Sequence, residues 1–431
     1  MKVLMFGWEF PPHISGGLGT ASYGLTKALL KTGIEIIFVV PRAYGDEEPG
    51  QVRLLNASEV LVDLTDESFK KHWNNLSFVE VDSAMVPYTG EEEYYEILKQ
   101  LEAGEEVQKL AGDPRKYSFS GGYGKNLLEE VERYALVGGA IARQHDFDMI
   151  HSHDWLTYMA GVEAKKVSGK PLVVHMHATE FDRSGEHVNQ KVYDIERIGM
   201  EAADMVIAVS NLTRSIVINR YGIDPAKVIT VHNGVEPSAA GKELDTKKHV
   251  KEKVVTFLGR ITYQKGPEYF IEAAYKVLLK TPNVRFVMAG SGDLLPKMIR
   301  RVAELGIATK FHFTGFLKGD DVDTMFGMSD VYVMPSVSEP FGISPLEAMR
   351  SNVPVIISKQ SGVSEILKHA IKIDFWDIDA MADAIYGLIR YESLPEMFKS
   401  HGKTEVENIK WDQAGVKVKA VYDQVARQYT F

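Results

Sequence analysis

The sequence predicts an α/β protein made of two doubly wound parallel-sheet domains that face a central cleft. Strand-like apolar runs alternate with amphipathic helices through residues 2–40 and 127–231, and again through residues 254–390, a pattern typical of parallel sheets. Polar residues follow the C-terminal ends of several of these strands, where open α/β sheets bind their ligands. Between the two series, residues 236–253 lose all apolar periodicity and include a lysine-rich run, which indicates an interdomain linker.

The composition is ordinary for a globular protein and excludes several classes. The chain has 431 residues, more than one ordinary core accommodates. Its formal net charge of −10 argues against general nucleic-acid binding, and the absence of cysteine excludes disulfides, thiolate metal sites and cysteine nucleophiles. No window approaches the roughly 18 uninterrupted apolar residues of a membrane span, and the N-terminus lacks the apolar core of a signal peptide. We therefore expect a cytoplasmic protein without membrane insertion.

The first series opens with a predicted strand over residues 2–6, a glycine-rich turn at residues 16–19 and a helix over residues 20–31. Gly33 marks the end of that helix, and residues 34–40 form the next strand. The glycine turn either lets a ligand approach the backbone or is a tight connection without a ligand, and a single glycine pattern does not decide between them.

Residues from about 45 to 120 lack this regularity, and we interpret them as an insertion in the first domain. Strands over residues 60–64 and 78–81 and helix over residues 91–110 are expected there. Regular patterning returns at residue 127 and continues through the rest of the chain. The expected helices cover residues 127–143, 268–280, 380–390, 395–408 and 411–429, with one more after Glu347, and the expected strands lie within residues 148–155, 172–177, 205–209, 228–231, 254–259, 284–289, 311–313, 330–334 and 355–357.

Two cations flank the first strand-to-helix loop of the second domain. Arg260 follows the strand over residues 254–259, and Lys265 lies near the start of a helix that begins around Pro267. Two cations beside a helix N-terminus suit a diphosphate. Two ordinary surface cations would give the same sequence, but the position in this loop favours the diphosphate.

Two carboxylates, Glu339 and Glu347, bracket the turn between the buried strand over residues 330–334 and the following helix. Carboxylates at this edge of a sheet can accept hydrogen bonds from the hydroxyls of a sugar and a ribose, which their position after a buried strand favours. The alternative is that Glu339 is a solvated turn residue, and that Ser344 and Glu347 form a capping box with Pro345 at the first helical position.

Two His-x-His pairs end two predicted strands, and each pair lies on one face of its strand. The pairs are His151 with His153 and His175 with His177, and Asp154 follows the first pair. Without a clear carboxylate partner, the two pairs do not specify zinc. We therefore expect no metal, and assign these residues to sugar contacts or substrate positioning.

Taken together, these residues resemble the retaining glycosyltransferases with two Rossmann-like domains (the GT-B type), and most closely glycosyltransferase family 4 and the glycogen and starch synthases. The resemblance covers nearly the whole chain outside residues 45–120, and the motifs are specific as an ordered set. The motifs are Gly16-Gly17-Leu18-Gly19, His151-x-His153-Asp154-Trp155, His177, Asn233-Gly234-Val235, Gly259-Arg260 with Gln264-Lys265-Gly266, and Glu339 with Glu347.

The resemblance implies that the donor is a nucleoside-diphosphate sugar. By that similarity Arg260 and Lys265 hold the diphosphate, and amides near Gly17 help from the other domain. Glu347 takes the ribose hydroxyls, and Glu339 takes the transferred sugar together with three backbone amides. Those amides belong to Phe341, Gly342 and Ile343.

The resemblance also implies that His177 contacts the transferred sugar across the cleft, while Asp154 and His153 lie near the acceptor. Transfer with anomeric retention then needs no metal, no other cofactor and no enzymic nucleophile, because a diphosphate oxygen assists deprotonation of the acceptor as the leaving group departs. The work of the protein is charge stabilisation and positioning. The expected catalytic set is His177, Glu339, Arg260 and Lys265.

For this fold we expect an acceptor domain over residues 1–238, a nucleotide-sugar domain over residues 239–410, and a C-terminal helix over residues 411–431 that crosses back to the first domain. Residues 153–155 and 260–267 look more like glycogen and starch synthases than like lipopolysaccharide mannosyltransferases. The expected reaction is therefore glucose transfer from ADP- or UDP-glucose to an α-1,4-glucan.

The sequence departs from the synthase pattern in two places, both of which bear on the donor. Those synthases carry a lysine before the first glycine loop, whereas Ile14-Ser15 precede it here. Residues 361–365 replace their more usual paired glycines. The first departure removes a diphosphate contact that could set the preference for ADP-glucose.

Three alternatives stay open. The acceptor could instead be a small sugar or a cell-envelope glycan, although no basic amphipathic helix points to a membrane-bound acceptor. The chain could bind a sugar nucleotide without transferring it, against which the complete set of glutamates and cations argues. It could also be a GT-B-like epimerase or phosphorylase, but a phosphorylase using pyridoxal phosphate needs a Schiff-base lysine that the sequence does not identify.

Overall fold

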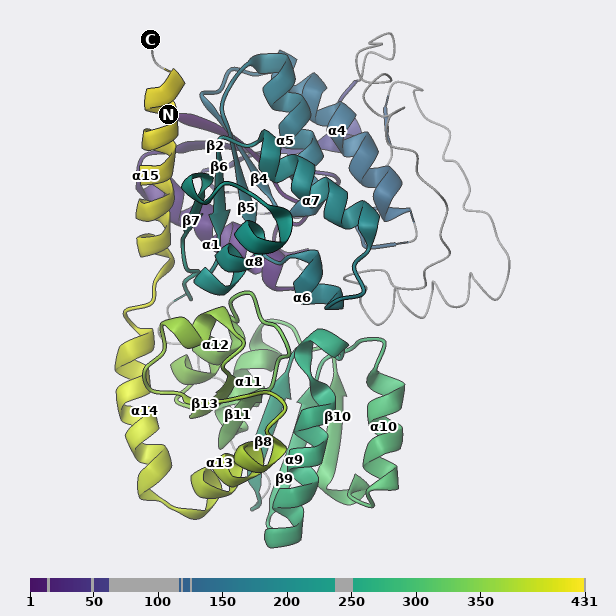
Figure 1. Ribbon diagram of the computed structural model, residues 1–431, viewed down its shortest axis with the longest axis vertical. Helices are drawn as coiled ribbons and strands as arrows, with labels where there is room; N and C mark the ends of the chain where they lie inside the picture. The colour runs from purple at the N-terminus through teal and green to yellow at the C-terminus, as the bar shows by residue number, and fades with distance from the viewer. Residues whose placement is uncertain are drawn as a thin grey trace, which may run out of the picture.

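The computed structural model describes residues 1–13, 16–47, 50–61, 116–117, 119–124, 126–236 and 251–429. It contains two parallel sheets stacked along the long axis of the molecule, each with helices on its faces (Figure 1). The predicted fold class, two doubly wound α/β domains, is confirmed. The predicted strand over residues 78–81 and helix over residues 91–110 lie outside the described residues.

The first sheet has seven parallel strands in the order β3-β2-β1-β4-β5-β6-β7. Its strand order reverses beside β1, which is the doubly wound arrangement. The strands are β1 (Lys2–Phe6), β2 (Glu35–Val40), β3 (Arg53–Asn56), β4 (Met149–His153), β5 (Leu172–Met176), β6 (Met205–Ala208) and β7 (Val228–Thr230). The helices of this part are α1 (Gly17–Lys31), α4 (Leu127–Gln144), α5 (Trp155–Ser168), α6 (Glu180–Ser184), α7 (Gln190–Ala202) and α8 (Asn211–Tyr221).

The second sheet has six parallel strands in the order β10-β9-β8-β11-β12-β13, which repeats the doubly wound arrangement. The strands are β8 (Lys253–Leu258), β9 (Val284–Ala289), β10 (Phe311–Gly315), β11 (Val331–Met334), β12 (Val355–Ser358) and β13 (Ile371–Ile373). The helices are α9 (Pro267–Lys280), α10 (Leu295–Glu304), α11 (Asp320–Met328), α12 (Ser344–Arg350), α13 (Ile378–Arg390) and α14 (Ser393–Val406).

Helix α15 (Trp411–Tyr429) follows α14 but lies beside the first sheet, whereas α14 lies beside the second (Figure 1). It packs on α1, and its apolar face completes a core that also contains residues of β1, β2, β4 and β5. At the crossing, the backbone N–H of Val235 donates to the carbonyl of Ile409 over 3.0 Å. The buried face of α15 consists of Trp411, Ala414, Gly415, Val418, Val421, Tyr422 and Val425.

Several local expectations were wrong. Helix α1 begins at Gly17 instead of Thr20, so most of the predicted glycine turn is already helical. The edge strand β3 (Arg53–Asn56) was not predicted, and the part of residues 60–64 that the structure describes lies outside any strand. Within the described ranges, no helix combines the length and the hydrophobicity that a membrane crossing needs.

Candidate active site

The loops that follow the C-terminal ends of the two sheets meet between the domains. The hydroxyl of Ser338, in the loop after β11, donates to Asp182 of α6 over 2.5 Å. Nearby, the hydroxyl of Thr213 in α8 donates to the carbonyl of Pro340 over 3.4 Å. The ligand-binding edges of both sheets therefore face each other across these contacts.

Lys265 and Glu339 come together although they are 74 residues apart in the sequence. The Nζ of Lys265, which ends a short 3₁₀ turn before α9, donates to Oε2 of Glu339 over 2.5 Å. The hydroxyl of Ser336 donates to the same oxygen over 3.1 Å. Because Glu339 is only 7% exposed, its carboxylate needs these donors, and the lysine charge is held at one point of the interdomain surface.

The turn that carries Glu339 is fixed by the loop after β12. The N–H of Glu339 donates to Gln360 O over 2.9 Å, and the N–H of Gly362 donates back to Glu339 O over 2.9 Å. A Cβ at Gly362 would lie 2.2 Å from the carbonyl oxygen of Pro340 and 2.4 Å from Cβ of Ser210 in the first domain. Only glycine permits this approach of three segments, so Gly362 sets how closely the domains meet.

Three consecutive backbone amides beside Glu339 have no protein acceptor. In the described part of the chain, the N–H groups of Phe341, Gly342 and Ile343 donate no hydrogen bond. Phe341 is 3% exposed, and Gly342 has φ +98° and folds back so that a Cβ there would touch Cγ of Glu339 at 3.2 Å. Ile343 is partly buried and is the N-cap of α12, where N–H groups have no partner within the helix, and a run of such N–H groups can bind an anion or a sugar oxygen.

Arg260 lies in the same loop as Lys265, after β8. The loop is tied to the one after β9, because the N–H of Ile261 donates to Ser291 O over 2.8 Å. The guanidinium of Arg260 donates to Gln264 Oε1 over 3.3 Å. Both residues predicted to bind the diphosphate therefore lie in one short loop that is hydrogen-bonded to its neighbour.

Glu347 lies in the first turn of α12, and the alternative interpretation of Ser344 and Glu347 as a capping box is wrong. Ser344 is itself helical, no side chain caps the helix, and the Ser344 hydroxyl accepts a hydrogen bond from Tyr332 over 2.8 Å. The carboxylate of Glu347 has no hydrogen-bond partner among the described residues. Burial raises its pKa above the ordinary value, although the nearby Arg350 opposes this rise. Capping does not explain Glu347, and its carboxylate remains available to a ligand.

The two His-x-His pairs form a stack of four imidazoles at the ends of β4 and β5. Ring centroids lie 4.3 Å apart for His151 and His153 and 4.4 Å apart for His175 and His177. His177 contacts the stack through its Nε2, which is 3.0 Å from Nδ1 of His153. Burial lowers the pKa of His177 to about 3 and holds the pKa values of the other three well below the usual range. All four rings are therefore neutral near pH 7.

Asp154 follows the stack as the N-cap of α5, with its carboxylate accepting from the N–H of Trp155 over 3.0 Å. Its φ of +65° is a left-handed conformation that a residue with a side chain adopts at a cost. Burial raises the pKa of Asp154 to about 6, and the Arg183 guanidinium opposes the rise. Strained backbone of this kind clusters at functional sites.

Gly17 is the predicted site residue that the structure does not bring to the others. It begins α1 and is exposed. Nothing in the described ranges lies within 4 Å of a Cβ built on it. Its role at the donor therefore remains a prediction.

The sequence did not point to the residues that join the two domains. Glu365 of the second domain accepts hydrogen bonds from the N–H groups of Asn211 and Leu212 at the start of α8, over 2.9 and 2.8 Å, and from His232 over 2.8 Å. Asp182 and Ser338 form a second cross-domain contact between side chains, in addition to the bond from Thr213 to Pro340. The partners of Glu365 and Asp182 are more than 130 residues away in the sequence, and no local pattern could have identified them.

Comparison with protein families decides the general activity. Residues 122–239 match the model described as Glycosyltransferase Family 4, and residues 242–405 match the model described as Glycosyl transferases group 1. The chain is a glycosyltransferase. The family that the motifs indicated is thereby confirmed, and the two models meet at the boundary between the two sheets.

Relatives of this glycosyltransferase act on different sugars. An uncharacterized glycosyltransferase of Methanocaldococcus jannaschii is 28% identical over 440 residues and covers 98% of both chains. Glycogen synthase of Mycobacterium tuberculosis is 22% identical over 376 residues, covering 85% of this chain and 80% of its own. The UDP-Gal:alpha-D-GlcNAc-diphosphoundecaprenol alpha-1,3-galactosyltransferase of Escherichia coli is 26% identical over 278 residues, covering 61% of this chain and 70% of its own.

Solved structures with the same fold confirm that this glycosyltransferase is of the GT-B type. Sucrose-phosphate synthase from Thermosynechococcus elongatus has a TM-score of 0.69 at 16% identity, with 98% of each chain covered. The HepE protein of Anabaena, solved in complex with UDP-glucose, has a TM-score of 0.64 at 18% identity, covering 98% of this chain and 100% of its own.

Proposed function

We propose that this glycosyltransferase moves glucose from ADP- or UDP-glucose onto an α-1,4-glucan with retention of the anomeric configuration, as a glycogen synthase does. The donor assignment rests on three backbone amides, Phe341 to Ile343, which have no acceptor among the described residues and lie beside the Lys265–Glu339 pair. Together they supply N–H donors, one ammonium and one carboxylate, which match a β-phosphate and a hexose.

In this proposal the diphosphate lies against Arg260 and Lys265. Charge develops on the β-phosphate as the glycosidic bond breaks, and fixed cations and amides stabilise that charge without reorganisation. The two cations come from one loop that is braced against the loop after β9. Neutralisation by protein groups makes the transfer independent of a metal.

Glu339 binds the transferred glucose, and Glu347 binds the ribose hydroxyls. Lys265 and Ser336 both donate to one oxygen of Glu339, so its second oxygen can accept from sugar hydroxyls. Glu347 has no protein donor in the described ranges, which suits a carboxylate that waits for hydroxyl donors.

The first domain supplies the acceptor side. His177, neutral because burial lowers its pKa to about 3, contacts the transferred glucose as a hydrogen-bonding group without charge. Asp154 lies on the acceptor side, and His153, which is 1% exposed, positions His177 through the contact between its Nδ1 and Nε2 of His177. The acceptor hydroxyl gives its proton to the departing diphosphate, so the reaction needs no enzymic nucleophile.

The glucan acceptor is supported by the match to glycogen synthase of Mycobacterium tuberculosis over most of both chains. A second candidate is a cell-envelope glycan acceptor, which the match to the Escherichia coli galactosyltransferase favours. That match covers a smaller share of this chain, 61% against 85%. A glucan is therefore the first acceptor to test, and small sugars are tested beside it as alternative acceptors.

The decisive experiment supplies ADP-, UDP- and GDP-sugars with and without glycogen and measures nucleoside diphosphate release. We expect release from one glucose donor that depends on glycogen, with the new residues removed by an α-1,4-specific glucosidase. Lys265→Ala should lower release by about 10²–10³-fold, and the exposed Lys318→Ala is the matched control. Donor binding without release would leave only a sugar-nucleotide-binding role, and absence of release with every glucose donor would overturn the proposal.

A further inference from the structure

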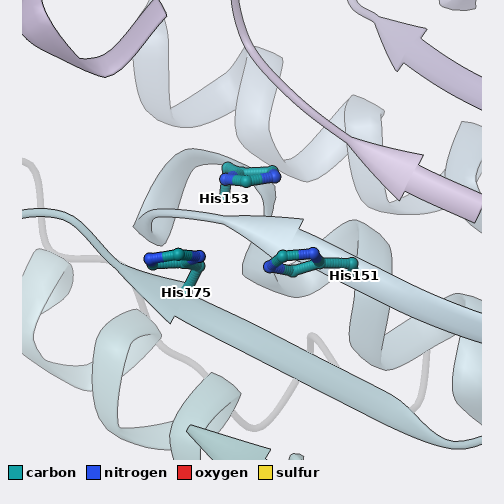
Figure 2. A group of neighbouring side chains, drawn as sticks. All are labelled: His151, His153 and His175. Atoms are coloured by element: carbon teal, nitrogen blue, oxygen red, sulfur yellow. The ribbon is translucent and has the colours of Figure 1, made fainter. Parts of the chain in front are cut away.

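His177 is held from two sides by different parts of the first domain. On one side its Nε2 lies 3.0 Å from Nδ1 of His153, in the stack of buried rings. Figure 2 shows three rings of that stack, those of His151, His153 and His175, nearly parallel at the ends of β4 and β5, with interplanar angles of 29°, 10° and 20°. On the other side the chain leaves β5 and enters α6, whose Arg183 turns back to the same loop. The stack orients the imidazole, and the loop sets how far it reaches toward the second domain.

Arg183 holds this loop through its backbone. Nη1 of Arg183 donates to the carbonyl oxygen of Ala178, the residue directly after His177, over 2.9 Å. The guanidinium also donates from Nε to Oε2 of Glu180 over 3.1 Å, and from Nη2 to Oε1 of Glu196 in α7. The side chain of Arg183 is 6% exposed, and Glu180 and Glu196 are 3% and 0% exposed. A planar guanidinium that donates to three buried acceptors is fixed in one orientation.

Glu196 ties this guanidinium to the rest of the first domain. Its Oε2 accepts from the N–H of Glu180 over 3.1 Å and from the hydroxyl of Tyr221, the last residue of α8. Its Oε1 accepts from Arg183. Both oxygens of the buried carboxylate therefore have donors, as a buried charge requires. Through this one side chain, α6 is fixed relative to α7 and α8.

The same short helix reaches the second domain. Oδ2 of Asp182 accepts from the N–H and the hydroxyl of Thr179 over 2.8 and 2.7 Å, and Oδ1 accepts from the hydroxyl of Ser338 across the domain boundary. Ser338 directly precedes Glu339, and His177 lies two residues before Thr179. A path of hydrogen bonds and short chain segments therefore runs from His177 to Glu339 through α6.

We propose that Arg183 is a positioning residue for glycosyl transfer. By holding the loop after β5 on α6, it sets the placement of His177 relative to the Glu339 turn, and it acts without touching donor or acceptor. This inference rests on the roles of His177 and Glu339 in the proposed function. A misplacement of about 1 Å can lower a rate about 10²-fold, so loss of this constraint should appear in kcat and much less in donor binding.

The test compares Arg183→Lys with two controls. Lysine keeps the charge but lacks the fork that reaches three acceptors. We expect kcat for transfer to fall at least about tenfold, while Kd for the nucleoside diphosphate, measured by calorimetry, changes by less than about twofold, because most of the proposed donor residues lie in the second domain. Arg197→Lys makes the same change in an exposed ion pair with Glu201 and should alter neither value. Val192→Ala removes buried volume from α7 and should lower the melting temperature without lowering kcat.

Ser338→Ala tests the other end of the path and leaves the buried cluster intact, so it decides the matter if Arg183→Lys folds poorly. It should lower kcat at least about threefold. The double variant should lose no more than about twofold beyond the poorer single variant, because both changes break one path.

Hydrolysis of the donor without glycogen is measured beside transfer in every variant. A wild-type chain that hydrolyses the donor but does not use glycogen would contradict the glucan acceptor, while its hydrolysis rates would still test Arg183. Wild-type kcat in Arg183→Lys or Ser338→Ala, losses that multiply in the double variant, or an equal loss of kcat in Val192→Ala would overturn the positioning role.

Discussion

The Nζ of Lys265 and Oε2 of Glu339 lie 2.5 Å apart, which joins the loop after β8 to the loop after β11. The side chains are 21% and 9% exposed, so each charge depends on the other for much of its compensation. In the proposed donor site, these two side chains are already fixed in position before a sugar nucleotide binds. The pair is therefore both a structural contact and the centre of the proposed donor site.

Replacing one member of this pair should affect activity and stability differently. Lys265→Met should lower transfer by about 10²–10³-fold, as loss of a charge-stabilising donor typically does. It should also lower the free energy of unfolding by about 1–3 kcal/mol, because Glu339 is left buried without its cation. Nucleotide release and urea unfolding measure the two effects.

The double variant Lys265→Met/Glu339→Gln tests this explanation. It should regain part of the lost stability but none of the activity, because the uncompensated charge is removed while the site stays dismantled. Equal unfolding free energies of the single and double variants would contradict a coupled pair.

Glu347 should make donor binding depend on pH. Burial raises the pKa of this carboxyl above its ordinary value, so the group becomes protonated at a higher pH than an ordinary glutamate. A protonated carboxyl loses acceptor capacity, and KM for the donor should therefore rise as the pH falls through the mildly acidic range. Glu347→Gln should show a higher KM that no longer changes over that range, and a retained pH dependence would exclude Glu347 as the titrating group.

Glu365 should hold the domains together. Its carboxylate accepts from two backbone N–H groups of α8 and from His232, and hydrogen bonds to a charged group contribute about 1.5–3 kcal/mol. Glu365→Ala should increase the radius of gyration measured by X-ray scattering and raise KM for the donor. The exposed Glu392→Ala should change neither the radius of gyration nor KM. An unchanged radius in Glu365→Ala would show that other contacts are enough to hold the domains together.

Gly362 should control how closely the domains meet. A methyl group there would collide with the Pro340 carbonyl and with Ser210. Gly362→Ala should lower kcat/KM at least about tenfold, because misplacing a positioning loop by about 1 Å can cost far more than that. Gly124→Ala, where a Cβ has no described atom within 4 Å, is the control. Circular dichroism should show intact secondary structure in both variants. Full activity of Gly362→Ala would contradict a role for Gly362 in domain positioning.

Strong periodicity made most of the fold predictable. The amphipathic pattern of α15 and the buried runs of β9 and β11 were recognised because burial on one face leaves a regular apolar spacing. Strand β3 was missed because an edge strand has a weaker pattern, and its residues are only partly buried. The capping box failed because Ser344 hydrogen-bonds to Tyr332, a partner from another element that local sequence does not reveal.

Some residues of the candidate site were likewise predictable from the sequence and others were not. Arg260 and Lys265 were predictable because a strand-to-helix loop has a known place in a doubly wound sheet. The pairing of Lys265 with Glu339 was implied only by position, and the roles of Asp182 and Glu365 were not foreseen, because such contacts depend on how the two domains dock.

The packing of α15 on α1 means that the core of the first domain is complete only when the last residues of α15 are present. The core between α1 and the first sheet includes Trp411, Val418 and Tyr422, which leave the ribosome after the whole second domain. Until then the apolar face of α1 lacks its partner, and the nascent chain exposes it. The second domain, whose sheet and helices α9 to α14 contain no such late residue, can fold first, in reverse of the usual order from the N-terminus.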